Sequence, residues 1–277
     1  MPDGAHGEVP REYREIRREM PVMTAYVLRH GETTKDKTNP KRGLTPEGES
    51  QLDQAAERLM SELDPDKDII QVFDSGNPRA ELSVMRVAER LKEGGFTFFS
   101  PIKMRWDPQT GEMHAQHEGL RTIDEPKSRS RRDIGAANIP DEYKAQLDDP
   151  ERHRALGIPE TIQDKRVATW FLADWPDEVE RPEQVNARVE EGIALAEKRV
   201  AMLAKQLGPG KRIVVVSAAN ATAIDAVVSA RTGLTPVERG GGIENAEGFK
   251  VDFSLNENPT FSVWGKDIET RLQPKIE

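Results

Sequence analysis

The chain reads Ala25-Tyr26-Val27-Leu28-Arg29-His30-Gly31-Glu32, an apolar run that passes directly into a polar tetrapeptide. Four apolar residues in a row predict a short buried strand. Such a strand carries the guanidinium of Arg29 and the imidazole of His30 to the edge of a sheet. A neutral imidazole nitrogen is a nucleophile toward phosphorus, and a guanidinium matches phosphate oxygens with two parallel hydrogen bonds. The stretch therefore predicts a sheet strand that ends in a phosphate site.

Strands and helices alternate on either side of a long insert. Helix starts are expected at Thr45-Pro46 and Asn77-Pro78, where a capping residue precedes a proline. The other expected elements are strands 24–28, 69–73, 212–217, 250–255 and 260–264, and helices 182–207 and 221–231. This alternation predicts an α/β fold with a mostly parallel sheet covered by helices on both faces.

Three polar segments follow strands of this predicted sheet: Arg29-His30, residues 75–79 and residues 217–220. Ligands of parallel sheets bind at the carboxyl ends of the strands. Helix starts near Arg79 and Asn220 offer backbone N–H groups to an anion. The segments therefore predict one phosphate pocket, with Asn220 as a substrate-binding residue.

The composition limits the class of protein. A chain of 277 residues with 36% hydrophobic residues and a mean hydropathy of -0.70 is polar but able to bury a large core. The net charge of -9 argues against nucleic acid as a partner. The absence of cysteine excludes disulfides and thiol nucleophiles. Without a signal region or a membrane-length apolar run, we expect a cytoplasmic protein that binds no membrane.

The expected domain organisation is a charged N-terminal arm over residues 1–22 and a single domain over residues 23–277. A long, irregular, charged insert at about residues 108–176 interrupts that domain and is expected to form a lid. Trp170, Phe171 and Trp175 are expected to pack the insert onto the body. The basic residues Arg131 and Arg132 are either substrate-binding residues or part of a solvated charge run.

Leu28-Arg29-His30-Gly31-Glu32 resembles the signature of the histidine phosphatase superfamily, in its phosphoglycerate mutase-like branch. Residues 43–48, 75–80, 180–188 and 214–217 resemble further segments of that family, in the same order. The resemblance implies a three-layer α/β/α sandwich and a phosphohistidine at His30. It also implies that Arg29 and Arg79 hold the phosphoryl group and that no metal or other cofactor takes part.

One position departs from the family. Its second catalytic histidine follows the serine that corresponds to Ser217, where this chain has Ala218. The five histidines of the chain are His6, His30, His114, His117 and His153. Loss of a group that stabilises the transition state costs on the order of 100-fold in rate or more. Ala218 is therefore interpreted either as an engineered substitution that disables turnover or as the mark of a natural pseudophosphatase.

The general acid is expected at Asp107, because Gly111 follows it at the family's spacing. Glu118 is the competing candidate, and Glu112 is a weaker one. Asp107 also precedes a proline, and Asp-Pro commonly begins a turn.

The predicted function is that of a phosphomonoester hydrolase, impaired by Ala218, which acts on a small-molecule phosphoester or binds inorganic phosphate. The alternatives are a silent pseudophosphatase that binds a phosphorylated ligand and a phosphoglycerate mutase-type phosphotransferase. The loop after Glu32 lacks the Trp-Asn pair common in glycolytic mutases, which favours the phosphatase.

Overall fold

The computed structural model describes residues 21–34, 43–99, 128–207, 210–255 and 257–265, together with the short pieces 104–107, 112–115, 122–123 and 126. For residues 104–107, 112–115, 122–123 and 199–206 it describes the backbone alone. The expected N-terminal arm lies outside the described residues, except for its last two positions.

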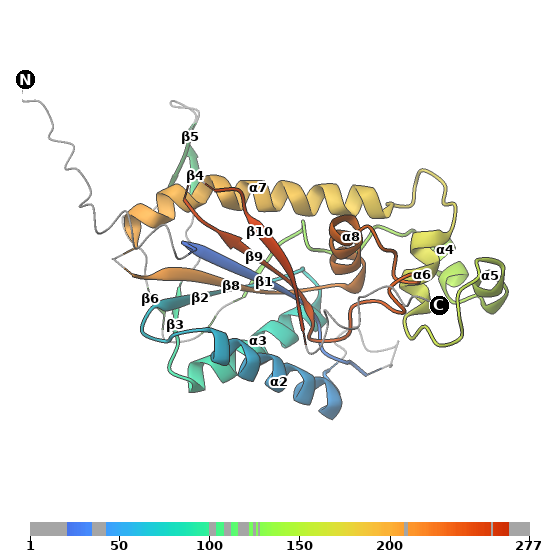
Figure 1. Ribbon diagram of the computed structural model, residues 1–277, viewed down its shortest axis with the longest axis horizontal. Helices are drawn as coiled ribbons and strands as arrows, with labels where there is room; N and C mark the ends of the chain where they lie inside the picture. The colour runs from blue at the N-terminus through green and yellow to red at the C-terminus, as the bar shows by residue number, and fades with distance from the viewer. Residues whose placement is uncertain are drawn as a thin grey trace, which may run out of the picture.

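A mixed sheet forms the centre of the molecule (Figure 1). Its strands run in the order β10-β9-β1-β8-β2-β3-β6, and β7 pairs with β2. Their bounds are β1 (Met23–Arg29), β2 (Asp68–Asp74), β3 (Thr97–Phe99), β6 (Thr122–Ile123), β7 (Arg129–Ser130), β8 (Arg212–Ala219), β9 (Gly248–Phe253) and β10 (Thr260–Trp264). Parallel pairs join β1, β8, β2, β3 and β7, whereas β9, β10 and β6 pair antiparallel at the edges. The expected mostly parallel sheet is confirmed.

Helices cover both faces of this sheet. Figure 1 shows α2 (Pro46–Glu62) and α3 (Pro78–Glu93) on one side, and α7 (Pro182–Gln206) and α8 (Ala221–Thr232) on the other. The three-layer α/β/α sandwich is therefore confirmed. Within the part of the chain that is described, no helix is both long and apolar enough to cross a membrane.

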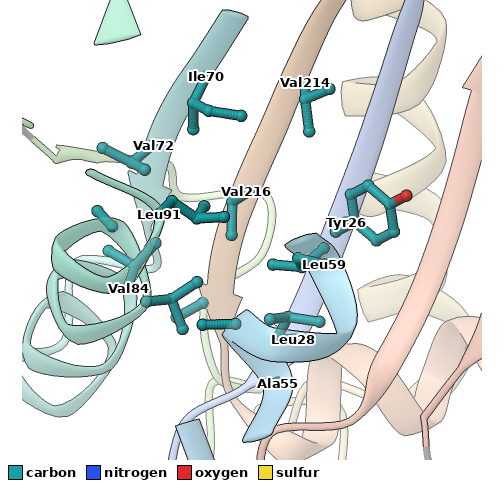
Figure 2. Packing of buried hydrophobic residues seen from close by; sticks show 14 of the residues in the cluster. Tyr26, Leu28, Ala55, Leu59, Ile70, Val72, Val84, Leu91, Val214 and Val216 are labelled. Carbon is teal, nitrogen blue, oxygen red and sulfur yellow. The ribbon is translucent and has the colours of Figure 1, made fainter. Parts of the chain in front are cut away.

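Side chains alternate between the two faces along each central strand, as the pleat of a strand requires. On the side of α2 and α3, Tyr26 and Leu28 of β1 pack beside Val214 and Val216 of β8 (Figure 2). On the opposite face, Val27 of β1 joins a second apolar cluster together with residues of β8, β9 and α8. Two full apolar layers thus hold β1 and β8 side by side and fix where both strands end.

The two predicted helix starts are present. The hydroxyl of Thr45 accepts a hydrogen bond from Gly48 N at 3.0 Å, and the Asn77 side chain accepts one from Arg79 N at 3.1 Å. In each case proline occupies the first turn, where its missing N–H leaves no bond unmade. These caps set the points at which α2 and α3 begin, close to the carboxyl edge of the sheet.

The insert is more regular than expected. Its residues include β6 and β7 of the sheet, one strand of the hairpin β4 (Met104–Asp107) and β5 (Glu112–Ala115), and four short helices. Those helices are α4 (Asp141–Lys144), η1 (Ala145–Leu147), α5 (Pro150–Ala155) and α6 (Lys165–Leu172). Trp170 and Trp175 pack in one cluster with residues of α8, and Phe171 packs against that cluster. The predicted packing of the insert onto the body is confirmed.

Candidate active site

The three predicted segments meet at the carboxyl edge of the sheet. Parallel pairing sets Arg29 of β1 against Ala219 of β8, and Asp74 of β2 against Ala218. One residue further on, the amide of Asn220 donates to the hydroxyl of Ser75 at 3.0 Å. The ends of three neighbouring strands therefore form one continuous rim.

His30 lies in this rim and is 8% exposed. Its Nδ1 lies 2.8 Å from the carbonyl oxygen of Gly31. A carbonyl can only accept a hydrogen bond, so Nδ1 carries the proton and the lone pair remains on Nε2. Burial lowers the pKa of His30 to about 4; the hydrogen bond to Gly31 opposes this, and the charges of Arg79 and Arg29 add to it. The imidazole is therefore neutral at pH 7, the form in which Nε2 is nucleophilic.

Two glycines allow the loop after His30 to lie against α2. A Cβ on Gly48 would stand 2.1 Å from the carbonyl oxygen of Glu32, and a Cβ on Gly31 would stand 2.8 Å from the carbonyl oxygen of Gly48. The N–H of Gly31 also donates to Ser83 of α3 at 3.1 Å. The loop after His30 is thus held between the first turn of α2 and Ser83 of α3, and the close approaches on the α2 side leave no room for a side chain on either glycine.

Two arginines lie near the imidazole. Arg79 stands in the first turn of α3, is partly exposed, and acts with its positive charge on His30. Arg29 donates from Nη1 to the carbonyl oxygen of Ile243 and from Nη2 to Asp164, both at 2.7 Å. Guanidinium groups stay charged in proteins, so Arg29 and Arg79 give this part of the rim a fixed positive charge.

A buried ion pair fixes the loop that holds Arg29. Asp225 and Arg239 have fully buried side chains and are joined at 2.8 Å. The same carboxyl oxygen of Asp225 accepts from Ile243 N at 3.1 Å, so the pair sets the position of the Ile243 carbonyl that binds Arg29. Burial raises the pKa of Asp225, and the charges of Arg239 and Arg29 oppose that rise. No local pattern in the sequence predicts this pair, because its two members lie 14 positions apart on different segments.

Ala218 lies on the β8 face that is turned toward α2 and α3. It is 3% exposed and belongs to the apolar cluster that contains Leu28 and Ala80. Among the histidines whose side chains are described, the other is His153, which lies in the insert 2.8 Å from the carbonyl oxygen of Leu147. Within the described side chains, no second imidazole accompanies His30.

The predicted general acid is described only through its backbone. Asp107 ends β4 and pairs with Glu112 in the β4–β5 hairpin. In Figure 1 this hairpin lies beside the C-terminal end of α7, which leads into β8. That is the end of the molecule where β8 begins, whereas His30 lies where β8 ends. Glu118 lies outside the described residues. The general-acid role of Asp107 stays a prediction.

The two arginines of the insert are not joined to the rim by their side-chain contacts. Arg131 donates from Nε to Asp133 at 3.1 Å, and its guanidinium carbon lies 5.6 Å from the centre of the Phe73 ring. Phe73 packs against the cluster on the α7 and α8 face of the sheet. Arg132 is exposed. Their predicted contact with substrate stays a prediction.

Asp164 is a further residue that the sequence analysis did not single out. It is the N-cap residue of α6, and its side chain joins Arg29. An aspartate directly before an apolar-periodic segment is a recognisable helix-start signal, but that signal says nothing of a contact with a residue 135 positions away.

The architecture and the rim define a phosphoglycerate mutase-like α/β fold, the fold of the histidine phosphatases. A solved structure that carries it is the phosphoglycerate mutase from Bacillus anthracis strain Sterne, at 16% identity over 94% of this chain and 98% of that one, with a TM-score of 0.51. The resemblance seen in the sequence is thereby confirmed at the level of the fold.

Two other solved structures show lower TM-scores. The mycobacterial glucosyl-3-phosphoglycerate phosphatase in complex with inorganic phosphate is 18% identical over 89% of this chain and 98% of that one, with a TM-score of 0.49. A putative alpha-ribazole-5'-P phosphatase from Escherichia coli is 15% identical over 88% and 97% of the two chains, with a TM-score of 0.46. No protein-family model and no curated protein matches the sequence.

Proposed function

We propose that this chain is built as a phosphomonoester hydrolase that works through a phosphohistidine on His30. The observation that carries the proposal is the state of that imidazole: Nδ1 is tied to Gly31, Nε2 keeps its lone pair, and the charges of Arg29 and Arg79 act on the ring. A neutral nucleophile beside two fixed cations is what attack on an anionic phosphorus centre requires.

The reaction has two steps. Nε2 of His30 bonds to phosphorus as the bond from phosphorus to the ester oxygen breaks, and that oxygen takes a proton from a carboxylic acid. Asp107 and Glu118 are the two candidates for this acid; because the hairpin that contains Asp107 lies at the opposite end of β8 from His30, Glu118 is the better one. Water then attacks the phosphohistidine, the N–P bond breaks, and inorganic phosphate leaves. Arg29 and Arg79 stabilise the charge on the three remaining oxygens in both steps, and Asn220 donates to one of them.

Ala218 is expected to impair this reaction. A buried methyl group offers the transferring phosphoryl group no hydrogen bond, where the family has an imidazole. The place of Ala218 in an apolar cluster favours a second candidate function, that of a protein whose pocket binds phosphate without turnover. The acidic net charge supports a small-molecule phosphoester, and not a nucleic acid, as the ligand.

The deciding experiment restores the missing imidazole. Ala218→His is compared with the unchanged chain and with Ala218→Gln, a side chain of similar size that cannot become a cation. We expect hydrolysis of p-nitrophenyl phosphate to rise on the order of 100-fold in Ala218→His only. A phosphohistidine trapped after rapid acid-free quenching should map to His30 by mass spectrometry and should be missing from the Ala218→His, His30→Ala double variant.

A folded Ala218→His protein that shows neither hydrolysis nor a phosphohistidine contradicts the hydrolase. If phosphate still binds the unchanged chain and His30→Ala abolishes that binding, the binding protein becomes the better description.

A further inference from the structure

Asp164 brings a negative charge from the insert to the signature arginine. One of its carboxyl oxygens accepts from Arg29 Nη2 at 2.7 Å, and the other accepts from Val167 N at 3.3 Å as the cap of α6. The two charged side chains are only 17% and 20% exposed. Partial burial makes this contact stronger than a pair on the open surface.

The carboxylate uses the part of Arg29 that suits a phosphate. Nη1 is occupied by the Ile243 carbonyl, whereas Nε has no hydrogen-bond partner among the described residues. An arginine binds a phosphate through parallel N–H groups; with Nη1 occupied, the pair that is left is Nε and Nη2, and Asp164 holds Nη2 with one carboxyl oxygen. A phosphate at this site and the Asp164 carboxylate therefore require the same donor, Nη2.

Asp164 also lies close enough to affect the nucleophile. Its negative charge acts on the His30 imidazole against the charges of Arg79 and Arg29. A carboxylate this near His30 repels a phosphate dianion at the same place, and it cancels part of the attraction of the two arginines. Competition for Nη2 and repulsion act in the same direction.

We propose that Asp164 is the residue of the insert that sets the phosphate affinity of the pocket, because it competes with phosphate for Arg29. The proposal rests on the phosphate pocket described under Proposed function. When phosphate binds, it takes Nη2 of Arg29, and the Asp164 carboxylate gives up that contact. The insert thereby selects for ligands that bind tightly enough to displace a carboxylate.

Asp164→Asn separates this effect from a structural one. Asparagine caps a helix about as well as aspartate does, because its carbonyl still accepts from Val167 N, but its NH2 group cannot accept from Arg29, so the variant keeps the cap and removes the competing carboxylate. Asp177→Asn is the matched control. It makes the same change in net charge directly after the insert, but Asp177 is fully exposed and lies 3.7 Å from Arg181.

The measurement is calorimetric titration with inorganic phosphate at low ionic strength. We expect Asp164→Asn to bind phosphate about tenfold more tightly than the unchanged chain, as one nearby charge typically produces. Asp177→Asn should bind as the unchanged chain does. Hydrogen exchange of α6 in the unchanged chain should become faster on addition of phosphate, because Asp164 leaves Arg29.

Three results overturn the proposal. Equal affinity shows that Asp164 does not compete, and weaker affinity shows that it orients Arg29 for phosphate instead. Equal tightening in Asp177→Asn shows that only the overall charge matters. In each of these cases, the proposed function is still supported if His30→Ala abolishes the binding of phosphate. Lack of phosphate binding by both the unchanged chain and folded Asp164→Asn contradicts the proposed function as well.

Discussion

The side-chain amide of Asn220 donates to the hydroxyl of Ser75 at 3.0 Å, although the two residues stand 145 positions apart. Asn220 occupies the N-cap position of α8, but its side chain makes no capping bond there. It is instead turned across the rim toward the residue that follows β2. The bond therefore joins the ends of β8 and β2 at the rim that contains His30.

Asn220→Ala should weaken phosphate binding by about tenfold, because it removes a buried donor from the rim and leaves Ser75 without it. Ser75→Ala should have a smaller effect of the same sign, because it leaves Asn220 present but no longer oriented. Calorimetric titration with phosphate measures both. Chemical denaturation of the same samples shows whether stability changes in parallel. A normal phosphate affinity in Asn220→Ala contradicts its proposed role.

Gly48→Ala should destabilise the fold by about 3 kcal/mol or more, because the new methyl group meets the Glu32 backbone and cannot move away. Gly43→Ala is the matched control. It lies in the connection that leads from β1 into α2, and a Cβ there meets nothing within 4 Å. Urea denaturation should place Gly43→Ala within about 0.5 kcal/mol of the unchanged chain. Similar values for the two variants would contradict the close approach.

His30 should make the protein less stable as the pH falls. Its folded-state pKa of about 4 lies below the ordinary value of 6.5, so the unfolded chain takes up a proton between these values while the folded chain does not. Stability from this group is complete above pH 6.5 and is lost as the pH falls toward 4, by about 3 kcal/mol in all.

The measurement is the difference in unfolding free energy between the unchanged chain and His30→Asn. This difference should be constant from pH 8 to 7. As the pH falls from 7 to about 4, the unchanged chain should lose stability relative to His30→Asn. Taking the difference removes the contribution of all other titrating groups. A difference that stays flat over this range shows that the imidazole is not buried as described.

Arg239→Met should destabilise the protein by about 3 to 5 kcal/mol, because it leaves the Asp225 carboxylate buried without its partner. The double variant Asp225→Leu, Arg239→Met should recover most of that stability, since two apolar side chains can replace a buried pair. It should still bind phosphate less tightly, because Ile243 N has lost its acceptor and the Ile243 carbonyl no longer fixes Arg29. Normal phosphate affinity in the recovered double variant would contradict this positioning role.

Much of the fold follows from local signals in the sequence. The helix expected at residues 182–207 is Pro182–Gln206, and the strand expected at residues 260–264 is Thr260–Trp264. Capping residues, prolines and apolar periodicity act within one or two turns, so a short window of sequence contains them. Strands β6 and β7 of the insert were not predicted, because they contain two residues each and owe their strand geometry to their neighbours β3 and β2.

The candidate site likewise contains residues that the sequence predicts and contacts that it does not. His30, Arg29, Arg79 and Asn220 could be named in advance, because each follows a strand or opens a helix that the sequence predicts. The contacts of Arg29 could not be named. Its partners Asp164 and Ile243 lie 135 and 214 positions away, and only the packing of the insert and of the loop after α8 brings them to it.

The sequence by itself determined the alternation of strands and helices, the segments at the rim and the absence of a histidine at position 218, since these depend on residue identity and local order. The tertiary structure alone decided the rest: which nitrogen of His30 carries the proton, which charges lower its pKa, and which carboxylate joins Arg29. These properties depend on burial and on distances between remote residues, and both come into existence only when the chain packs.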